Sequence, residues 1–159
     1  MSRLLIDAMA WNYVAKARVL DKLLRSLPEP AIMLPPVARQ LEPALAAWPE
    51  LSVVLNAAET GLIEETDLAE EEYDVLAQLD ESYPGLGSTD CALLAVAQLR
   101  NWSLLTCDDR LRKTAIRLGI TLVDLTDILD RAVSGGQLSE ADRDWVVYYS
   151  QGGTRRRSE

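Results

Sequence analysis

The amino-acid sequence predicts an α/β fold, a three-layer α/β/α sandwich with a central, mostly parallel sheet of about four to five strands. Two observations predict this class. Short apolar segments typical of buried strands alternate along the chain with longer segments whose apolar residues recur at helical spacing. With 159 residues, 48% of them hydrophobic, the chain is also long enough to form one domain around a substantial core.

Short apolar segments are expected to form the strands of the sheet. In chain order they are Arg3–Asp7, Ala31–Leu34, Leu62–Glu65, Ser103–Thr106 and Ile120–Val123. Because helical segments separate them, we expect the strands to run parallel and helices to cover both faces of the sheet.

The segments between these strands have helical spacing. Apolar residues from Trp11 to Leu27 predict one helix that ends before Pro28, since proline cannot continue a helix. Pro35 and Pro36 are expected to open the helix Val37–Ala47, because proline is tolerated in a first turn. The other expected helices are a stretch ending at Ala58, Leu68–Leu79 capped by Thr66 or Asp67, a helix from about Ser88, Leu111–Leu118, Thr126–Val133 and Ser139–Tyr149.

The chain is expected to form a single domain over residues 1–150, and its last helix spans about residues 139–149. Residues 151–159 form a tail rich in glycine and arginine, which we expect to be disordered. The acidic run Glu70–Glu72 is expected to be a solvated helix face.

The sequence contains no histidine and only two cysteines, Cys91 and Cys107. This composition excludes Ser-His-Asp and Cys-His catalysis, histidine-ligated zinc and a four-cysteine zinc site. Two cysteines do not make a disulfide framework, and we expect both to be small buried apolar residues. Carboxylates remain for chemistry, and their oxygen atoms suit Mg²⁺ or Mn²⁺.

The formal net charge of −9 argues against a broad electrostatic grip on nucleic acid. A local basic patch or a bound metal ion can nevertheless reverse the field at one site. No apolar run approaches the ~20 residues that span a bilayer, so no membrane association is expected. The first residues do not resemble a signal peptide, and a cytoplasmic location is expected.

Acidic residues are concentrated at one edge of the expected sheet. Asp7 ends the first strand, and Asp108 and Asp109 follow the fourth. Asp90 lies in the first turn of the helix that starts near Ser88. Taken singly, each acid could cap a helix or interact with a helix dipole. Together, carboxylates at the carboxyl edge of a parallel sheet would repel one another without a cation, which predicts a metal site.

Three segments in this order resemble the PIN-domain nucleases over roughly residues 3–133. They are Leu-Leu-Ile-Asp from Leu4, Ser-Thr-Asp-Cys-Ala-Leu-Leu-Ala-Val-Ala from Ser88, and Leu-Leu-Thr-Cys-Asp-Asp-Arg-Leu-Arg from Leu104. The resemblance implies a PIN-like α/β fold and RNA cleavage that depends on Mg²⁺ or Mn²⁺. It implies that Asp7, Asp90 and Asp108 are the catalytic metal ligands, and Asp109 is an alternative to Asp108 or an added ligand.

The same resemblance suggests partners. Many PIN domains are toxins of bacterial toxin–antitoxin pairs, such as the VapC type, so a small antitoxin protein is a candidate partner alongside the RNA substrate. A homodimer is also expected.

One position departs from the family pattern. PIN domains usually carry a glutamate in a Val-x-x-Glu-Leu segment, and here Val37–Leu41 places Gln40 there. Glu42 lies two residues on, rotated by ~200° around a helix, so it cannot easily substitute. Gln40 can offer a carbonyl oxygen to a metal or hold a metal-bound water, but it contributes no charge. A catalytically impaired PIN fold that binds RNA or protein is therefore the alternative function.

The implied mechanism is metal-assisted phosphodiester hydrolysis, in which the metal lowers the pKa of a bound water. Single-stranded or looped RNA is the expected substrate, because its splayed backbone reaches a cleft more easily than a duplex does. Arg110 and Arg112, with Lys113 and Arg117, could contact that backbone or form a solvated helix face. A phosphotransferase or phosphatase is disfavoured, because Ala8–Met9 after Asp7 leaves no Asp-x-Asp pair.

Overall fold

The computed structural model describes residues 2–158 and contains one five-stranded parallel sheet over that range, in the order β3-β2-β1-β4-β5. The strands are β1 (Leu4–Ile6), β2 (Ala31–Met33), β3 (Glu64–Glu65), β4 (Ser103–Leu105) and β5 (Leu122–Val123). The predicted α/β class and each of the expected strands are confirmed.

The three central strands form the middle of the core. Leu5 of β1 pairs with Ile32 of β2 on one side and with Leu104 of β4 on the other, and all three side chains are buried. Parallel strands covered on both faces consist of continuous apolar residues, and these strands show that pattern. The edge strand β3 is short, exposed and acidic, and such charges discourage pairing with other chains.

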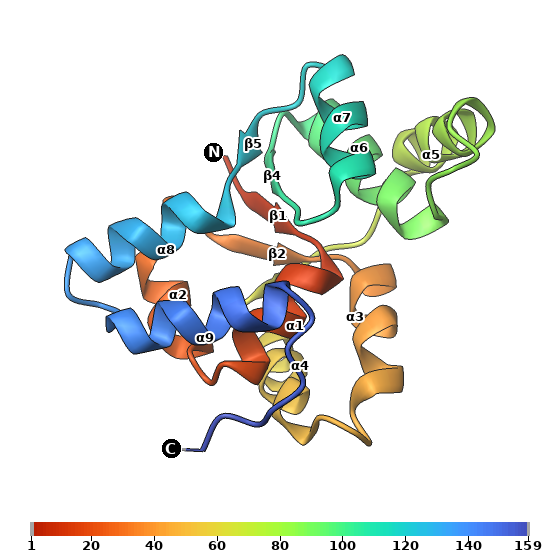
Figure 1. Ribbon diagram of the computed structural model, residues 1–159. Helices are drawn as coiled ribbons and strands as arrows, with labels where there is room; N and C mark the ends of the chain where they lie inside the picture. Colours follow the sequence, from red (N-terminus) through yellow and green to blue (C-terminus); the bar gives the residue numbers. More distant parts are fainter. Residues whose placement is uncertain (1, 159) are drawn as a thin grey trace.

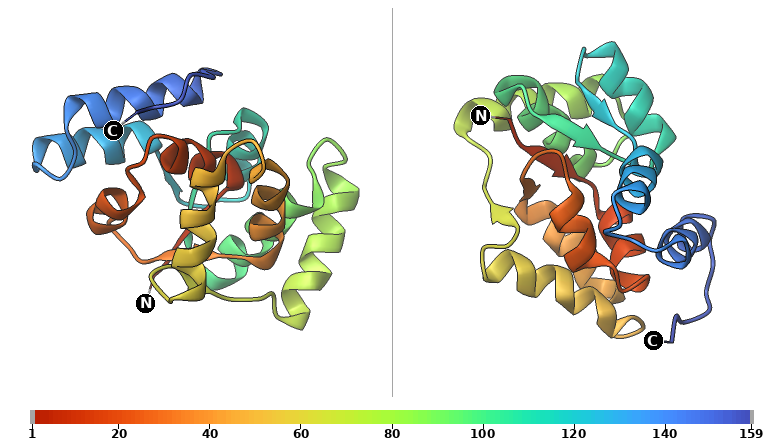
Figure 2. Two further views of the ribbon diagram at one scale, coloured as in Figure 1. Left: turned by 90° about the horizontal axis from the view of Figure 1, so that it is seen from below. Right: turned by 90° about the vertical axis from the view of Figure 1, so that its left-hand side faces the viewer.

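Helices cover both faces of the sheet (Figures 1 and 2). One layer contains α5 (Glu70–Ser82), α6 (Ser88–Arg100) and α7 (Asp109–Arg117), and the other contains α1 (Ala8–Lys16) and α4 (Ser52–Glu59). Helix α6 is buried along Cys91–Ala97, because the sheet lies on one side of it and α5 packs on the other. None of the described helices is long and apolar enough to cross a membrane.

The helix expected over Trp11–Leu27 is interrupted in the structure. Helix α1 ends at Lys16, and α2 (Leu20–Ser26) starts a new direction after Arg18, whose φ is 61°. Left-handed backbone is uncommon for a residue with a side chain, so neither spacing nor propensity predicts the break. The apolar residues on both sides of it are buried, which is why the pattern resembled one continuous stripe.

Two helix boundaries also differ from those expected. Helix α3 (Pro35–Leu41) ends before Ala47, and the chain continues in the short 3₁₀ turns η1 (Glu42–Ala44) and η2 (Pro49–Leu51). Pro43 explains the early end, since it has no N–H to donate. Helix α5 begins at Glu70 after Ala69, and neither Thr66 nor Asp67 caps it.

Glu72 corrects the prediction that the whole acidic run is solvated. Its carboxylate is buried, accepts from the backbone N–H of Ala69 at 2.7 Å, and pairs with Arg100 of α6 at 2.6 and 2.7 Å. Glu70 and Glu71 are exposed as expected. The ion pair therefore fixes α5 against α6, and the acid occupies the first helical turn, where negative charge is favoured.

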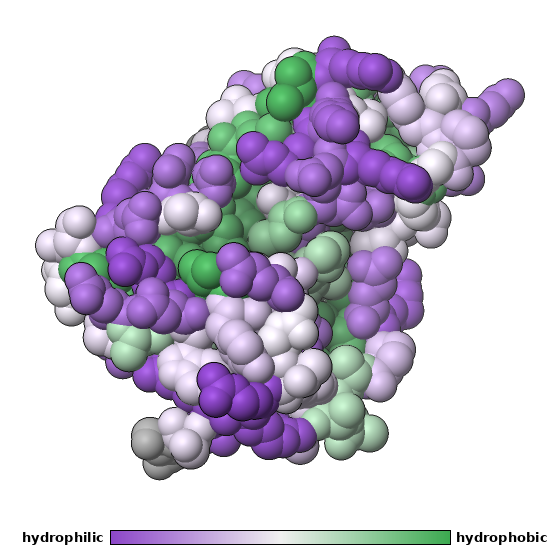
Figure 3. Space-filling model, in the orientation of Figure 1, coloured by the Kyte–Doolittle hydropathy of each residue, from purple (hydrophilic) through white to green (hydrophobic). Residues whose placement is uncertain are grey.

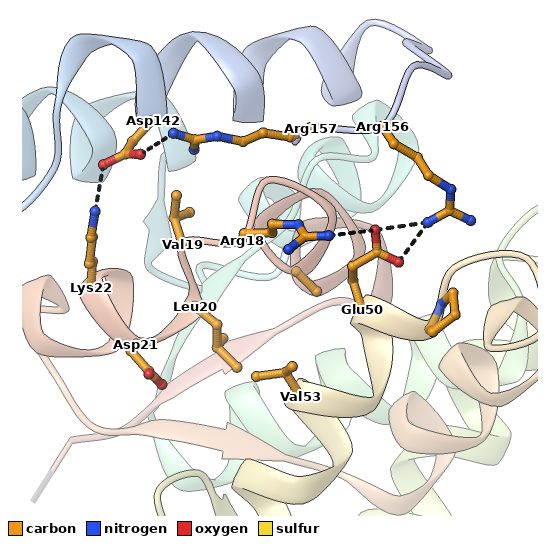
Figure 4. A pocket seen from close by; sticks show the side chains of 12 residues that line it. Arg18, Val19, Leu20, Asp21, Lys22, Glu50, Val53, Asp142, Arg156 and Arg157 are labelled. Carbon is orange, nitrogen blue, oxygen red and sulfur yellow. Dashed lines mark hydrogen bonds and ion pairs between the residues drawn. The ribbon is translucent and has the colours of Figure 1, made fainter. Parts of the chain in front are cut away.

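The C-terminal segment packs onto the layer that contains α1. Helix α8 (Leu125–Ser134) contacts α2, and α9 (Glu140–Ser150) contacts α1. The tail after α9, for which composition predicts disorder, contacts the domain through two arginines. Arg156 donates to the Glu50 carboxylate at 2.8 and 2.9 Å, and Arg157 pairs with Asp142 at 2.8 Å (Figure 4). Composition cannot show that two acids distant in sequence will face these arginines.

Candidate active site

Asp7 links the end of β1 to the start of α1. It caps α1 through Oδ1, which accepts from the backbone N–H of Ala10 at 2.8 Å. Its Oδ2 accepts from the backbone N–H of Cys107 at 3.1 Å and from the hydroxyl of Thr106, both at the end of β4. The side chain is 4% exposed, so these bonds hold a buried carboxylate where two adjacent strands end.

Burial raises the pKa of Asp7 above its ordinary value, because a low-dielectric environment disfavours the charged form. The hydrogen bonds from Thr106, Ala10 and Cys107 oppose this rise, and the nearby charge of Asp108 adds to it. The net pKa is raised, so the carboxylate is held in a site that penalises its negative charge.

Asp90 is the third residue of α6 and is half-buried. Its pKa is raised to about 6, first by burial and then by the charges of Asp108 and Asp7, and a backbone hydrogen bond from Gly87 opposes the rise. The electrostatic interactions among the three acids show that the fold brings them together at the carboxyl edge of β1 and β4.

Asp108 caps α7. Its Oδ1 accepts from the backbone N–H groups of Arg110 at 2.8 Å and Leu111 at 3.1 Å. Asp109 is the first residue of α7 and is exposed, and it is not among the charges that raise the pKa of Asp90. The charge of Asp108, unlike that of Asp109, acts on the pKa of both Asp7 and Asp90.

Thr106 connects two of the acids and was not singled out by sequence reasoning. Its hydroxyl donates to Asp7 and accepts from the backbone N–H of Asp108 at 3.0 Å. The available signal was its position, two residues before Asp108 at the end of a strand. Spacing alone does not distinguish such a positioning group from an ordinary buried threonine.

The donor chemistry of the three acids fits a hard divalent cation, since carboxylate oxygens are its preferred ligands and a cation would relieve their mutual repulsion. Their side chains do not form a ready-made cage. Within residues 2–158, no group of three acidic or cysteine side chains is arranged to hold a metal ion. Both oxygens of Asp7 accept hydrogen bonds from protein groups, and Oδ1, which accepts only one, keeps a lone pair for a metal ion.

Gln40 is exposed on α3 and lines two hollows. One hollow, of about 340 Å³, lies between α3, α5 and the start of α6, and it reaches Thr89 next to Asp90. The other, of about 480 Å³, lies between α1 and α3 and reaches Ala8 next to Asp7. Gln40, the residue that departs from the family pattern, therefore lies between two hollows whose linings include the sequence neighbours of Asp7 and Asp90.

Basic residues accompany the acids on α7. Arg110 is exposed and donates to the backbone oxygen of Gly85 at 3.3 Å, so it lies over the loop before α6. Arg112 is half-buried and its charge acts on Cys107. Hydrophilic side chains gather over α7 in the space-filling view (Figure 3). This face offers positive charge next to Asp108.

The two cysteines are not activated nucleophiles. Burial raises the pKa of Cys91 to about 11 and that of Cys107 to about 12, and nearby carboxylates add to both shifts. Both thiols therefore stay protonated at neutral pH.

The profile of the PIN domain family matches residues 4–117, which include β1 through α7 and the acids of the candidate site, Asp7, Asp90, Asp108 and Asp109. The match covers well over half of the chain, and the chain belongs to the PIN domain family. PIN domains are generally nucleases that use divalent metal ions. No curated protein matches the sequence.

Proposed function

We propose that this chain is a ribonuclease that hydrolyses RNA phosphodiester bonds with the help of Mg²⁺ or Mn²⁺. One observation carries the proposal. Asp7, Asp90 and Asp108 share one electrostatic field at the carboxyl edge of the sheet, where burial and mutual repulsion raise the pKa of Asp90 to about 6. Perturbed carboxylates that converge in this way are typical of functional sites.

In this proposal Asp7, Asp90 and Asp108 hold the metal, with Asp109 and the amide oxygen of Gln40 as further ligands. The metal, when bound, supplies an activated water and neutralises charge that develops on the phosphate. Thr106 holds Asp7 and the start of α7 in register, so that two of the ligands keep a fixed separation. Arg110 and Arg112 position the RNA backbone next to Asp108.

The experiment is cleavage of a single-stranded RNA by the purified protein, with Mn²⁺ and with EDTA. We expect cleavage only with metal, and Asp7→Asn, Asp90→Asn and Asp108→Asn should each reduce it by more than the about 10–100-fold that outer-shell changes cost. Asp127→Asn is the matched control, since this exposed acid in α8 undergoes the same charge change. A larger loss for Asp109→Asn than for Asp108→Asn would transfer the ligand role to Asp109.

Gln40 favours a second candidate function. An amide in place of a carboxylate leaves one fewer charge for the metal, so the chain could bind RNA or protein without cutting it. Binding of RNA by a parent protein that shows no metal-dependent cleavage would establish this alternative.

Family membership also supports a biological setting that we propose for the chain. It would act in the cytoplasm as the toxin of a toxin–antitoxin pair, as a homodimer that a small antitoxin protein holds inactive. A small reading frame beside the gene, whose product co-purifies with the chain and suppresses cleavage, is the expected finding. Sedimentation of the isolated chain as a monomer would contradict the homodimer.

A further inference from the structure

The hollow between α3, α5 and the start of α6 combines aromatic, apolar and polar side chains in its lining. Metal binding does not explain this combination. The hollow measures about 340 Å³. Its lining includes Arg39, Gln40, Leu68, Tyr73, Leu76 and Thr89. We propose that this hollow binds a single unpaired nucleobase of the RNA substrate, next to the phosphodiester bond that is hydrolysed at the acidic site. The inference rests on the proposed ribonuclease function and specifies a substrate feature that the site would recognise.

Tyr73 supplies the stacking surface. The residue is 51% exposed and lines the hollow. Its hydroxyl donates to the carboxylate of Asp67 at 3.1 Å, which restrains the ring at one end. An exposed ring held in one orientation is the arrangement on which single-stranded nucleic acids stack their bases.

The remaining lining suits a base better than a phosphate. Leu68 and Leu76 provide apolar contact, and the NH₂ group of the Gln40 amide offers donors to a base edge. Arg39 supplies a cation near Tyr73, because its charge opposes the effect of Asp67 on the pKa of the Tyr73 hydroxyl. A few polar groups around apolar and aromatic walls are characteristic of small-ligand sites.

Size and charge favour a base over a protein segment. The volume lies at the low end of the about 300–1,000 Å³ range of ligand pockets, enough for a flat ring system but small for a folded element. The hollow has no acidic residue in its lining, although the whole chain carries a net charge of −9. Stacking would let such an acidic protein hold RNA without a broad basic surface, since it depends less on salt than phosphate contacts do.

The experiment uses the full chain and a short single-stranded RNA. The comparison substrate is the same RNA in which the two nucleotides that flank the cleaved phosphate lack their bases. Tyr73→Ala should raise KM about tenfold or more with little change in kcat, whereas Tyr73→Phe, which keeps the ring but loses the bond to Asp67, should raise KM less. The abasic substrate should reproduce the loss in the parent and add no further loss in Tyr73→Ala. Unchanged melting temperatures establish that both variants fold.

Binding of the labelled RNA to Asp108→Asn, followed by fluorescence anisotropy, separates this inference from the proposed function. If the parent cuts no RNA but RNA binding falls with Tyr73→Ala or with the abasic substrate, the base pocket is supported and the proposed nuclease activity is overturned. If the parent cuts RNA and neither change alters KM, the base pocket is overturned. If no RNA binds at all, the hollow is overturned as a base site.

Discussion

Thr106 and Asp90 show opposite ways in which single residues support the site. Thr106 joins the buried Asp7 to the N-terminal end of α7, so its hydroxyl stabilises the native state and orders two acids at once. Asp90 does the reverse, because its half-buried carboxylate faces the charges of Asp108 and Asp7. Functional residues that lower the stability of the fold are expected where carboxylates repel one another until a cation binds.

This contrast leads to a prediction for Asp90. A folded-state pKa near 6, above the ordinary 3.8, means that the ionised group destabilises the fold above about pH 6 and that this effect fades as pH falls toward 3.8. Asp90→Asn removes the charge, so without metal at pH 8 we expect a gain of about 1–2 kcal/mol, after a discount for solvent screening. Melting in EDTA measures this gain.

Metal should reverse the order of the melting temperatures of the parent and Asp90→Asn. Millimolar Mn²⁺ is expected to raise the melting temperature of the parent more than that of Asp90→Asn, because the variant has lost a charged ligand. A variant that melts below the parent in EDTA would show that the acid acts as a stabilising helix-start charge instead.

The break between α1 and α2 yields a test in which both variants lose the same side chain. Arg18 has a φ of 61°, which costs about 1–2 kcal/mol for a residue with a Cβ, whereas glycine adds about 0.5–1 kcal/mol of unfolded-state entropy. Arg18→Gly should therefore be more stable than Arg18→Ala by about 0.5–1 kcal/mol in urea unfolding. Equal stability would mean that the alanine variant relaxes the turn.

The same elements show why the strands were predictable and several contacts were not. Leu4–Ile6 and Ser103–Leu105 are apolar at every position or nearly so, and burial on both faces of a parallel sheet dictates that pattern locally. The edge where Asp7 and Asp108 meet follows from strand direction. The left-handed backbone at Arg18 has no local signal, and the bond from Thr106 joins residues 99 positions apart, so neither can be inferred from spacing.

The C-terminal tail packs against one side of the domain. Arg156 and Arg157 reach across a hollow of about 760 Å³ between the α1–α2 turn, α4 and α9 (Figure 4). Arg157 also donates to the backbone oxygen of Ala17 at 2.9 Å, so the tail contacts the same turn that Arg18 shapes. Segments from both ends of the chain are thereby tied together far from the acids of the candidate site.

Asp142 pairs with the tail through Arg157. Its pKa predicts how the stability of the fold depends on pH. Burial alone would raise its pKa, but hydrogen bonds from Ser139, Arg157 and Lys22 outweigh burial and lower the pKa to about 2. A folded-state pKa below the ordinary 3.8 contributes stability that is complete above about pH 4 and is lost as pH falls toward 2. The free energy of unfolding should therefore drop across that window.

Asp142→Asn should be less stable than the parent at pH 6 and should lose less stability between pH 4 and pH 2, because the variant has no carboxylate to protonate there. Asp144→Asn is the matched control, since Asp144 lies on the same helix but is 72% exposed, and it should keep the parent's slope. Urea unfolding at intervals across this range measures both slopes. Parallel curves for Asp142→Asn and the parent would show that folding does not lower the pKa of Asp142, and acid sensitivity would then have to arise elsewhere in the molecule.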